Sequence, residues 1–299
     1  MGRDDRSGLF GADPKIGNKF GDLYGTFWSN GKLPHELKEV VRIRNARLTD
    51  CGYWKNVRFS LAREAGLDEK TASLIDNDWE AKELQSKWKA ALLFTDSFIL
   101  TPGKLADDIK SELINSFEPE EALELSLGLG LFHGFSKLLI ALGREPEEME
   151  TTVIPTPTAP EKPANFYIDS SHELAGLLAP SPNLRDRWLH LEESLWEMDA
   201  FPTAELRAIQ LRIAKLLGVP DEYLPPIQVT AKADLKFTHF ADSFLFDIRS
   251  ITSKDTEEIR GQYGDVGLLH LMMCLAIYDG IYRVASTQIH TSLDQGDTE

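Results

Sequence analysis

One cysteine and the charged residues near it form the part of the sequence best suited to chemistry. Cys51 lies in the segment EVVRIRNARLTDCGYWKNVR, residues 39–58. A thiolate is a strong nucleophile, and a cation close to the sulfur favours the thiolate over the thiol. Arg58 follows Cys51 by seven residues, about two helical turns, so a helix would place both side chains on one face. The alternative is that Cys51 is a small buried residue that packs well.

Glu39 is the second residue of interest because it interrupts an apolar helix face. Two valines follow it directly, and a charge at such a position is costly unless it is paired. An ion pair with Arg42, Arg44 or Arg58 would remove that cost. Such a pair is either purely structural or part of a functional site.

Helices are the elements predicted to hold these residues. Over residues 37–48, apolar side chains recur three and four positions apart, as one buried helix face requires. A second helix is predicted from Val57 to Ala65, with Gly66 as its end. Residues 1–18 are predicted to be a loose arm. No strand pattern bounded by tight turns occurs, so we predict an all-α fold. The helical pattern starts at Phe20, and later helices are predicted at 88–100, 105–117 and 118–143.

A proline-rich segment divides the chain into two parts. Residues 151–163, TTVIPTPTAPEKP, contain four prolines, which keep the backbone extended and cannot continue a helix. We therefore predict a first domain at 1–150, a linker at 151–165 and a second helical domain at 166–299.

The two predicted domains also share an internal similarity without gaps. Residues 20–48 match the chain 168 positions later, where Trp28 meets Trp196, and residues 94–142 match it 146 positions later. Matching aromatic residues and prolines are not required by helical periodicity alone. Because the two shifts differ by 22 residues, the second copy lacks about 22 residues, which include the counterpart of Cys51.

The segment around Cys51 resembles the core of the alkylhydroperoxidase D-like family, which also contains the carboxymuconolactone decarboxylases. Redox members of that family carry a glutamate twelve residues before a Cys-x-x-Cys pair, and a histidine four residues after it. Here Glu39 lies twelve residues before Cys51. Trp54 stands at the position of the second cysteine and Arg58 at that of the histidine. Tyr53 stands between the cysteine positions, where some members have another histidine.

This resemblance covers residues 20–143 well and 185–288 more faintly. It implies two tandem alkylhydroperoxidase D-like helical domains, the second shortened, in a symmetric homo-oligomer such as a dimer or trimer. It also implies an antioxidant oxidoreductase with peroxiredoxin activity. In that hypothesis Cys51 is the nucleophile, Glu39 the acid/base, and Arg58 replaces the relay histidine. Because no second sulfur stands nearby, an external thiol would have to resolve the sulfenic acid.

Two other functions stay open at this point. One is a non-redox lyase, decarboxylase or isomerase that acts on a small organic acid or lactone. There Arg58 would hold a carboxylate, Glu39, Tyr53 or His133 would move protons, and Trp54 and His133 would contact the substrate. The other is a non-catalytic binding protein that has kept the fold, since fold alone does not set function. None of the three hypotheses requires a cofactor or a metal.

The composition limits the classes of partner. The chain has 299 residues, 42% of them hydrophobic and 27% charged, which is enough for two globular domains. A net charge of −16 argues against nucleic acid and anionic membranes as partners. The sequence contains no run of eighteen apolar residues, so no membrane span is expected. The first residues lack the pattern of a secretory signal. Two cysteines form neither a disulfide framework nor a zinc site, which favours a reducing, cytoplasmic setting.

Overall fold

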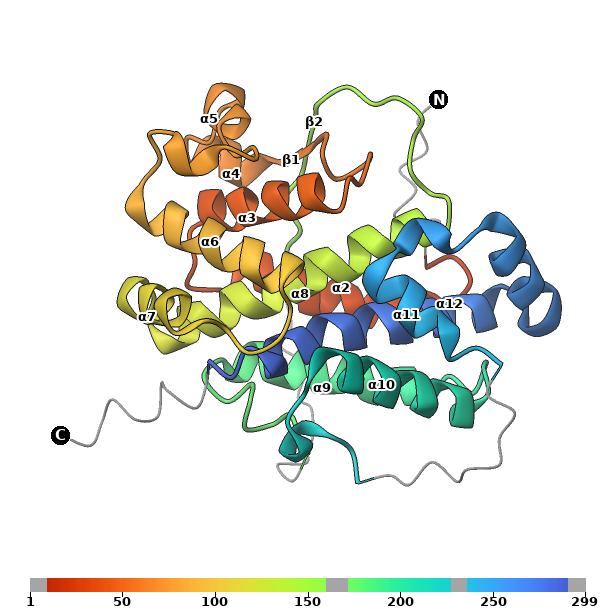
Figure 1. Ribbon diagram of the computed structural model, residues 1–299. Coiled ribbons are helices and arrows are strands. Elements are labelled where there is room, and N and C mark those ends of the chain that lie inside the picture. The colour runs from red at the N-terminus through yellow and green to blue at the C-terminus, as the bar shows by residue number, and fades with distance from the viewer. Residues whose placement is uncertain (1–9, 160–171, 227–235, 290–299) are drawn as a thin grey trace.

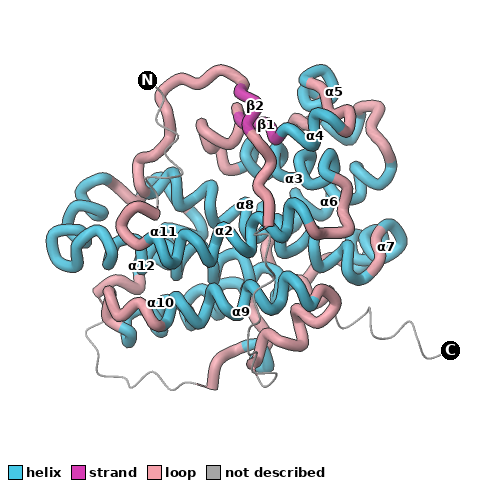
Figure 2. Tube along the Cα trace, turned by 180° about the vertical axis from the view of Figure 1, so that it is seen from behind, coloured by secondary structure: helices cyan, strands magenta, loops and turns pink. Residues whose placement is uncertain are grey.

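The chain folds almost entirely into helices. The computed structural model describes residues 10–159, 172–226 and 236–289 (Figures 1 and 2). Within them the all-α prediction is confirmed. The longer helices are α2 (Pro14–Ser29), α3 (His35–Leu48), α6 (Ser86–Leu100), α7 (Asp107–Ser116), α8 (Pro119–Ala141), α9 (Pro182–Trp196), α10 (Thr203–Leu217), α11 (His239–Phe246) and α12 (Ser253–Ser286). The shorter elements are α4 (Ser60–Glu64), α5 (Glu69–Ser73) and three 3-10 turns, η1 (Trp79–Ala81), η2 (Asp221–Tyr223) and η3 (Ile248–Ser250).

Two local predictions are wrong. Helix α2 begins at Pro14, before the predicted start at Phe20, because Asp13 caps it and accepts hydrogen bonds from two backbone N–H groups of its first turn. Residues 57–59 are not helical. They form strand β1 (Val57–Phe59), which pairs in parallel with strand β2 (Thr152–Ile154), shown in magenta in Figure 2.

Part of the predicted linker packs against the first half of the chain. Besides the strand pairing, the Thr156 hydroxyl accepts a hydrogen bond of 2.9 Å from the Leu61 N–H. The backbone then passes so close to α2 that a Cβ atom on Gly25 would lie 2.2 Å from the Thr158 oxygen. Residues 152–159 are therefore held against the first half, and residues 160–165 lie outside the described part of the chain.

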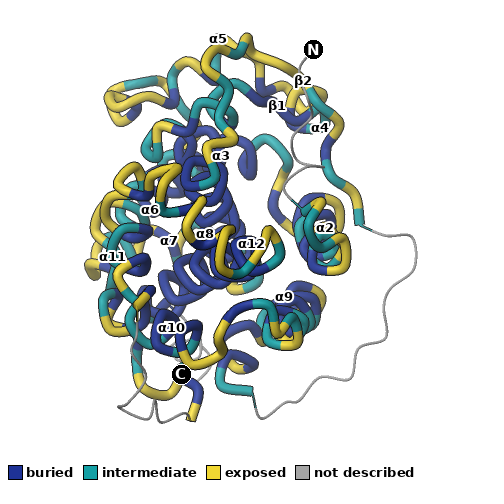
Figure 3. The backbone as a smooth tube through the Cα atoms, turned by 90° about the vertical axis from the view of Figure 1, so that its right-hand side faces the viewer, coloured by how far each residue is buried: buried dark blue, intermediate teal, exposed yellow. Residues whose placement is uncertain are grey.

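Helices α8 and α12 pack together at the centre of the fold. Figure 3 shows the buried residues concentrated along α8, where nearly the whole helix is dark blue. By length and composition alone, either helix is apolar enough to cross a membrane. The apolar window of each is 100% buried inside the structure, as expected of the core helices of a globular protein.

The contacts between α8 and α12 are reciprocal under the 146-residue shift. A Cβ on Gly134 would lie 2.2 Å from the Ala276 oxygen, and one on Gly280 would lie 2.7 Å from the Gly130 oxygen. Residues 276 and 280 are the shifted counterparts of 130 and 134, so exchanging the two copies turns the contact of 134 with 276 into the contact of 280 with 130. This is the pattern of an isologous, two-fold interface.

Helices α2 and α9 show the same pattern under the 168-residue shift. Both helices begin at a proline, Pro14 and Pro182, whose positions differ by that shift. Arg187 forms an ion pair of 3.0 Å with Asp22, and Lys19 contacts His190. The internal duplication stays a prediction, and these reciprocal contacts favour it.

A buried group of charges lies where α8 and α12 cross. Asp279 accepts hydrogen bonds from Lys137 at 2.8 Å and from Arg283 at 2.7 Å, and His133 Nε2 lies 3.7 Å from the same carboxylate. Although burial raises the pKa of Asp279, the two cations outweigh that effect and its pKa is lowered. The pKa of His133 is lowered well below its usual value, first by burial and then by the same cations.

Buried histidines make the stability depend on pH. Burial lowers the pKa of His270, which is 2% exposed, to about 4. Below the unfolded value of about 6.5, the unfolded chain binds a proton that folded His270 does not, so stability falls as the pH drops. We expect a loss of about 2 kcal/mol between pH 8 and pH 5 from this residue alone. Chemical denaturation of the wild type and of His270→Leu at both pH values measures it, and an equal pH effect in the two would contradict it.

Candidate functional site

Glu39 forms a buried ion pair with Arg42, one turn further along α3. Arg42 donates from Nε to Oε2 at 2.7 Å and from Nη2 to Oε1 at 2.6 Å, and both residues are 1% exposed. The predicted pairing of Glu39 with an arginine is thus confirmed for Arg42. Burial lowers the pKa of Arg42, but the Glu39 carboxylate outweighs this and its pKa is raised, so the guanidinium stays charged.

Arg42 also ties α3 to the loop after Cys51. Its Nη1 donates to the Trp54 carbonyl at 2.8 Å, and its Nη2 donates to the Val57 carbonyl. Oε1 of Glu39 also accepts a hydrogen bond of 3.2 Å from the Phe59 N–H. The Glu39–Arg42 pair therefore provides hydrogen-bond partners for backbone groups of the segment that carries the predicted motif. This is a structural role.

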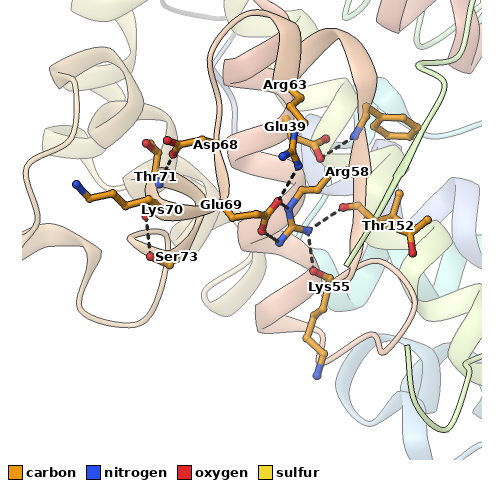
Figure 4. A network of polar contacts seen from close by, with 12 residues as sticks. Glu39, Lys55, Arg58, Arg63, Asp68, Glu69, Lys70, Thr71, Ser73 and Thr152 are labelled. Atoms are coloured by element: carbon orange, nitrogen blue, oxygen red, sulfur yellow. Dashed lines mark hydrogen bonds and ion pairs between the residues drawn. The ribbon is translucent and has the colours of Figure 1, made fainter. Parts of the chain in front are cut away.

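Arg58 pairs with a different carboxylate, although it shares the Val57 carbonyl as an acceptor with Arg42. It donates to the Glu69 carboxylate of α5 at 3.1 and 3.2 Å, and to the carbonyls of Lys55 and Val57 at 2.8 Å. Figure 4 shows Arg58 and Arg63 both directed toward Glu69, while Glu39 is engaged separately. Glu39 and Arg58 are therefore each paired with another charged side chain, Arg42 and Glu69.

Cys51 is fully buried, with 0% of its surface exposed. Burial raises the pKa of its thiol to about 11, although the N–H groups of Trp54 and Tyr53 act in the opposite direction. The other cysteine, Cys274 in α12, is also buried and free, and burial raises the pKa of its thiol as well. Neither sulfur has the solvent exposure of a reactive thiolate.

We predict that Cys51 resists alkylation in the folded protein. At pH 8, a thiol with a pKa of about 11 has a far smaller thiolate fraction than an ordinary one, so iodoacetamide should react about 100-fold more slowly than after unfolding. Peptide mass spectrometry measures the two rates, with Cys51→Ser as the blank. Fast alkylation of the native protein, with a sulfenic acid trapped after peroxide, would instead support the one-cysteine peroxidase.

An apolar cavity of about 290 Å³ lies beside the predicted motif. It opens between α2 and α8, and its walls are mostly aromatic and aliphatic. Cys51, Glu39 and Arg58 do not line it. The residues that do are Phe10, Phe20, Gly21, Tyr24, Arg42, Trp54, Leu131, Phe132, Phe135, Ser136, Leu139 and Pro157.

A few polar groups border this cavity. Ser136 Oγ accepts a hydrogen bond of 3.0 Å from Asn45, whose oxygen lies 3.1 Å from His133 Nδ1. His133 therefore does not line the cavity, and Asn45 connects it to Ser136 in the cavity wall. Trp54 is in the wall itself, and its Nε1–H is buried with no acceptor among the described residues. Tyr53 is half-buried and packs its ring against Trp54, with the centroids 4.9 Å apart.

Sequence reasoning missed most of this cavity. Its aromatic wall comes from two helices far apart in the chain, and the spacing of Phe20 and Tyr24, or of Phe132 and Phe135, is also that of ordinary core residues. Of the predicted site residues, only Trp54 lines the cavity. In the described ranges, no group of three or more His, Cys, Asp or Glu residues is placed to hold a metal ion.

Comparison with known proteins identifies relatives without a described function. No family model matches the chain. Two proteins of Mycobacterium tuberculosis, from strains CDC 1551 / Oshkosh and ATCC 25618 / H37Rv, are each 32% identical to it over 107 residues. Both are described as uncharacterized. The alignment covers 36% of this chain and 37% of each relative, so the chain spans little more than a third of their length. No solved structure matches the chain, and the resemblance to the alkylhydroperoxidase D-like family stays a prediction.

Proposed function

We propose that this chain is a non-catalytic binding protein whose site for a small apolar molecule is the cavity between α2 and α8. The observation that carries the proposal is the cavity itself, about 290 Å³ of mostly aromatic and aliphatic lining with a few polar groups. Concave, mainly apolar spaces of this size with few polar contacts are typical of small-molecule sites.

The arrangement of the candidate catalytic residues also supports binding rather than catalysis. A peroxidase needs a thiolate that meets the peroxide, whereas Cys51 is 0% exposed and lies outside the cavity lining. A lyase for small acids needs a free cation beside a proton-transfer group. Arg42 and Arg58 are each bound to their own carboxylate, Glu39 and Glu69.

A fluorescent probe tests the proposal on the full chain. N-phenyl-1-naphthylamine is uncharged and brightens in apolar surroundings, so its emission should rise to saturation as the protein is titrated. Gly21 is exposed in α2 and lines the cavity, and a Cβ there would meet nothing within 4 Å. Gly21→Trp should therefore obstruct the cavity and weaken binding, whereas Gly21→Ala should keep it.

The two glycine variants also separate binding in the cavity from binding elsewhere. Both substitutions are compatible with the helix, so circular dichroism should show the same helical content in each. If the wild type shows no saturable rise in emission, the proposed function is wrong. If Gly21→Trp binds as well as Gly21→Ala, the probe is not in this cavity and the proposed site is wrong.

A further inference from the structure

The predicted second copy has buried counterparts of several cavity-lining residues, and at some positions the counterpart is larger. Under the shifts of 168 and 146, Phe20 corresponds to Trp188, and Ser136 corresponds to Tyr282. Trp188 is 1% exposed and Tyr282 is 0% exposed. A serine in the cavity wall of the first half is thus replaced by a large buried ring in the second.

The side chains at these second-half positions bond to one another. Gln210, the counterpart of Arg42, donates to the Tyr282 hydroxyl at 2.9 Å. Tyr278, the counterpart of Phe132, donates to Glu192 and packs its ring 5.2 Å from that of Tyr282. In the second half, these polar side chains are therefore hydrogen-bonded to other groups within the protein.

The charges beside the first cavity limit the kind of ligand it accepts. The positive charge of Arg42 is already matched by Glu39, and that of nearby Lys38 by Glu124 at 2.6 Å. A carboxylate in the cavity would lose its hydration without gaining a free counter-charge, which is strongly unfavourable. The lining offers donors for an uncharged acceptor. The Trp54 Nε1–H is buried with no acceptor among the described residues, and one Nη1 hydrogen of Arg42 is not bonded to the Trp54 carbonyl.

We infer that the first half binds one uncharged, mostly apolar molecule per chain, which carries a hydrogen-bond acceptor such as a ketone or ester carbonyl. Ser136 keeps the space open at the position that Tyr282 fills in the second half. This inference rests on the proposed function and adds to it the ligand class, the stoichiometry and the residue that decides whether a copy can bind.

A matched pair of competitors tests the ligand class on the wild-type chain. 2-Acetylnaphthalene and 2-naphthoate share one ring system and differ in a neutral ketone against a carboxylate. With N-phenyl-1-naphthylamine bound, the ketone should displace it at a concentration at least about 10-fold lower than the carboxylate does, a difference of about 1.4 kcal/mol. Equal or stronger displacement by the carboxylate would overturn the inference, while probe binding itself would still support the proposed function.

A substitution copied from the second half tests the role of Ser136. Ser136→Tyr places the side chain of the counterpart in the first cavity and should reduce probe affinity at least about 10-fold, with the helical content unchanged. If that variant does not fold, Leu139→Trp occupies the same space from the next turn of α8 and should have the same effect. Undiminished binding in a folded variant, or two bound probes per wild-type chain, would contradict the inference.

Discussion

Glu39→Gln is expected to lower the free energy of unfolding by about 3–5 kcal/mol, because it leaves the buried Arg42 guanidinium without a counter-charge. Both side chains are 1% exposed, so water does not replace the lost partner. The glutamine also loses one of the two strong hydrogen bonds to Arg42 in either orientation of its amide, and it loses the Phe59 N–H contact as well if the NH2 group replaces Oε1. Urea denaturation followed by circular dichroism measures the change.

The second arginine pair of the same segment supplies the control. Glu69 faces Arg58 in a comparable geometry, but its side chain is 43% exposed. Although Arg58 is 7% exposed, water reaches the Glu69 side of the pair, so Glu69→Gln should cost less than Glu39→Gln. If the two glutamine variants lost the same stability, burial would not be what makes the Glu39–Arg42 pair important. A double variant, Glu39→Leu with Arg42→Met, should recover part of the loss because no unpaired charge remains.

Gly134→Ala is expected to destabilise the fold by about 3 kcal/mol, although alanine normally stabilises a helix. The added methyl group would lie 2.2 Å from the Ala276 oxygen, which belongs to the backbone of α12 and has no rotamer to change. Helices α8 and α12 must then move apart along their buried contact. Thermal and urea unfolding both report the loss.

An exposed glycine of α12 gives the opposite expectation for the same substitution. A Cβ on Gly261 would meet nothing within 4 Å, so Gly261→Ala should raise the free energy of unfolding by about 0.5–1 kcal/mol. A stabilising effect at both positions would show that α8 and α12 do not approach as closely as described. The two variants differ in a single methyl group each, so the contrast isolates the helix contact.

Much of the fold was accessible from local patterns. Apolar spacing and helix-end residues predicted the helices at 88–100, 105–117 and 118–143 to within a few residues of α6, α7 and α8. The misplaced elements are those whose structure depends on a distant partner. Residues 57–59 form a strand only because residues 152–154 pair with them. No local pattern in either short segment predicts that pairing.

The candidate site divides in the same way. The sequence by itself determined that Glu39 must have a cationic partner, since a carboxylate in an apolar helix face is costly alone. It did not decide which arginine that partner is. Arg42 holds the pair from within α3, while Arg58 is drawn to Glu69 of α5. Three cations lay within reach along the chain, and only packing of the segment against α3 and α5 selected among them.

Burial and open space were decided by the tertiary structure alone. Whether Cys51 is reactive depends on its solvent exposure, and the cavity depends on how the side chains of α2 and α8 pack around it. Helical periodicity says which face of a helix turns inward, because that information is local. It does not say whether the inward faces of two distant helices meet, because a gap is a property of the pair of surfaces and of no residue in either.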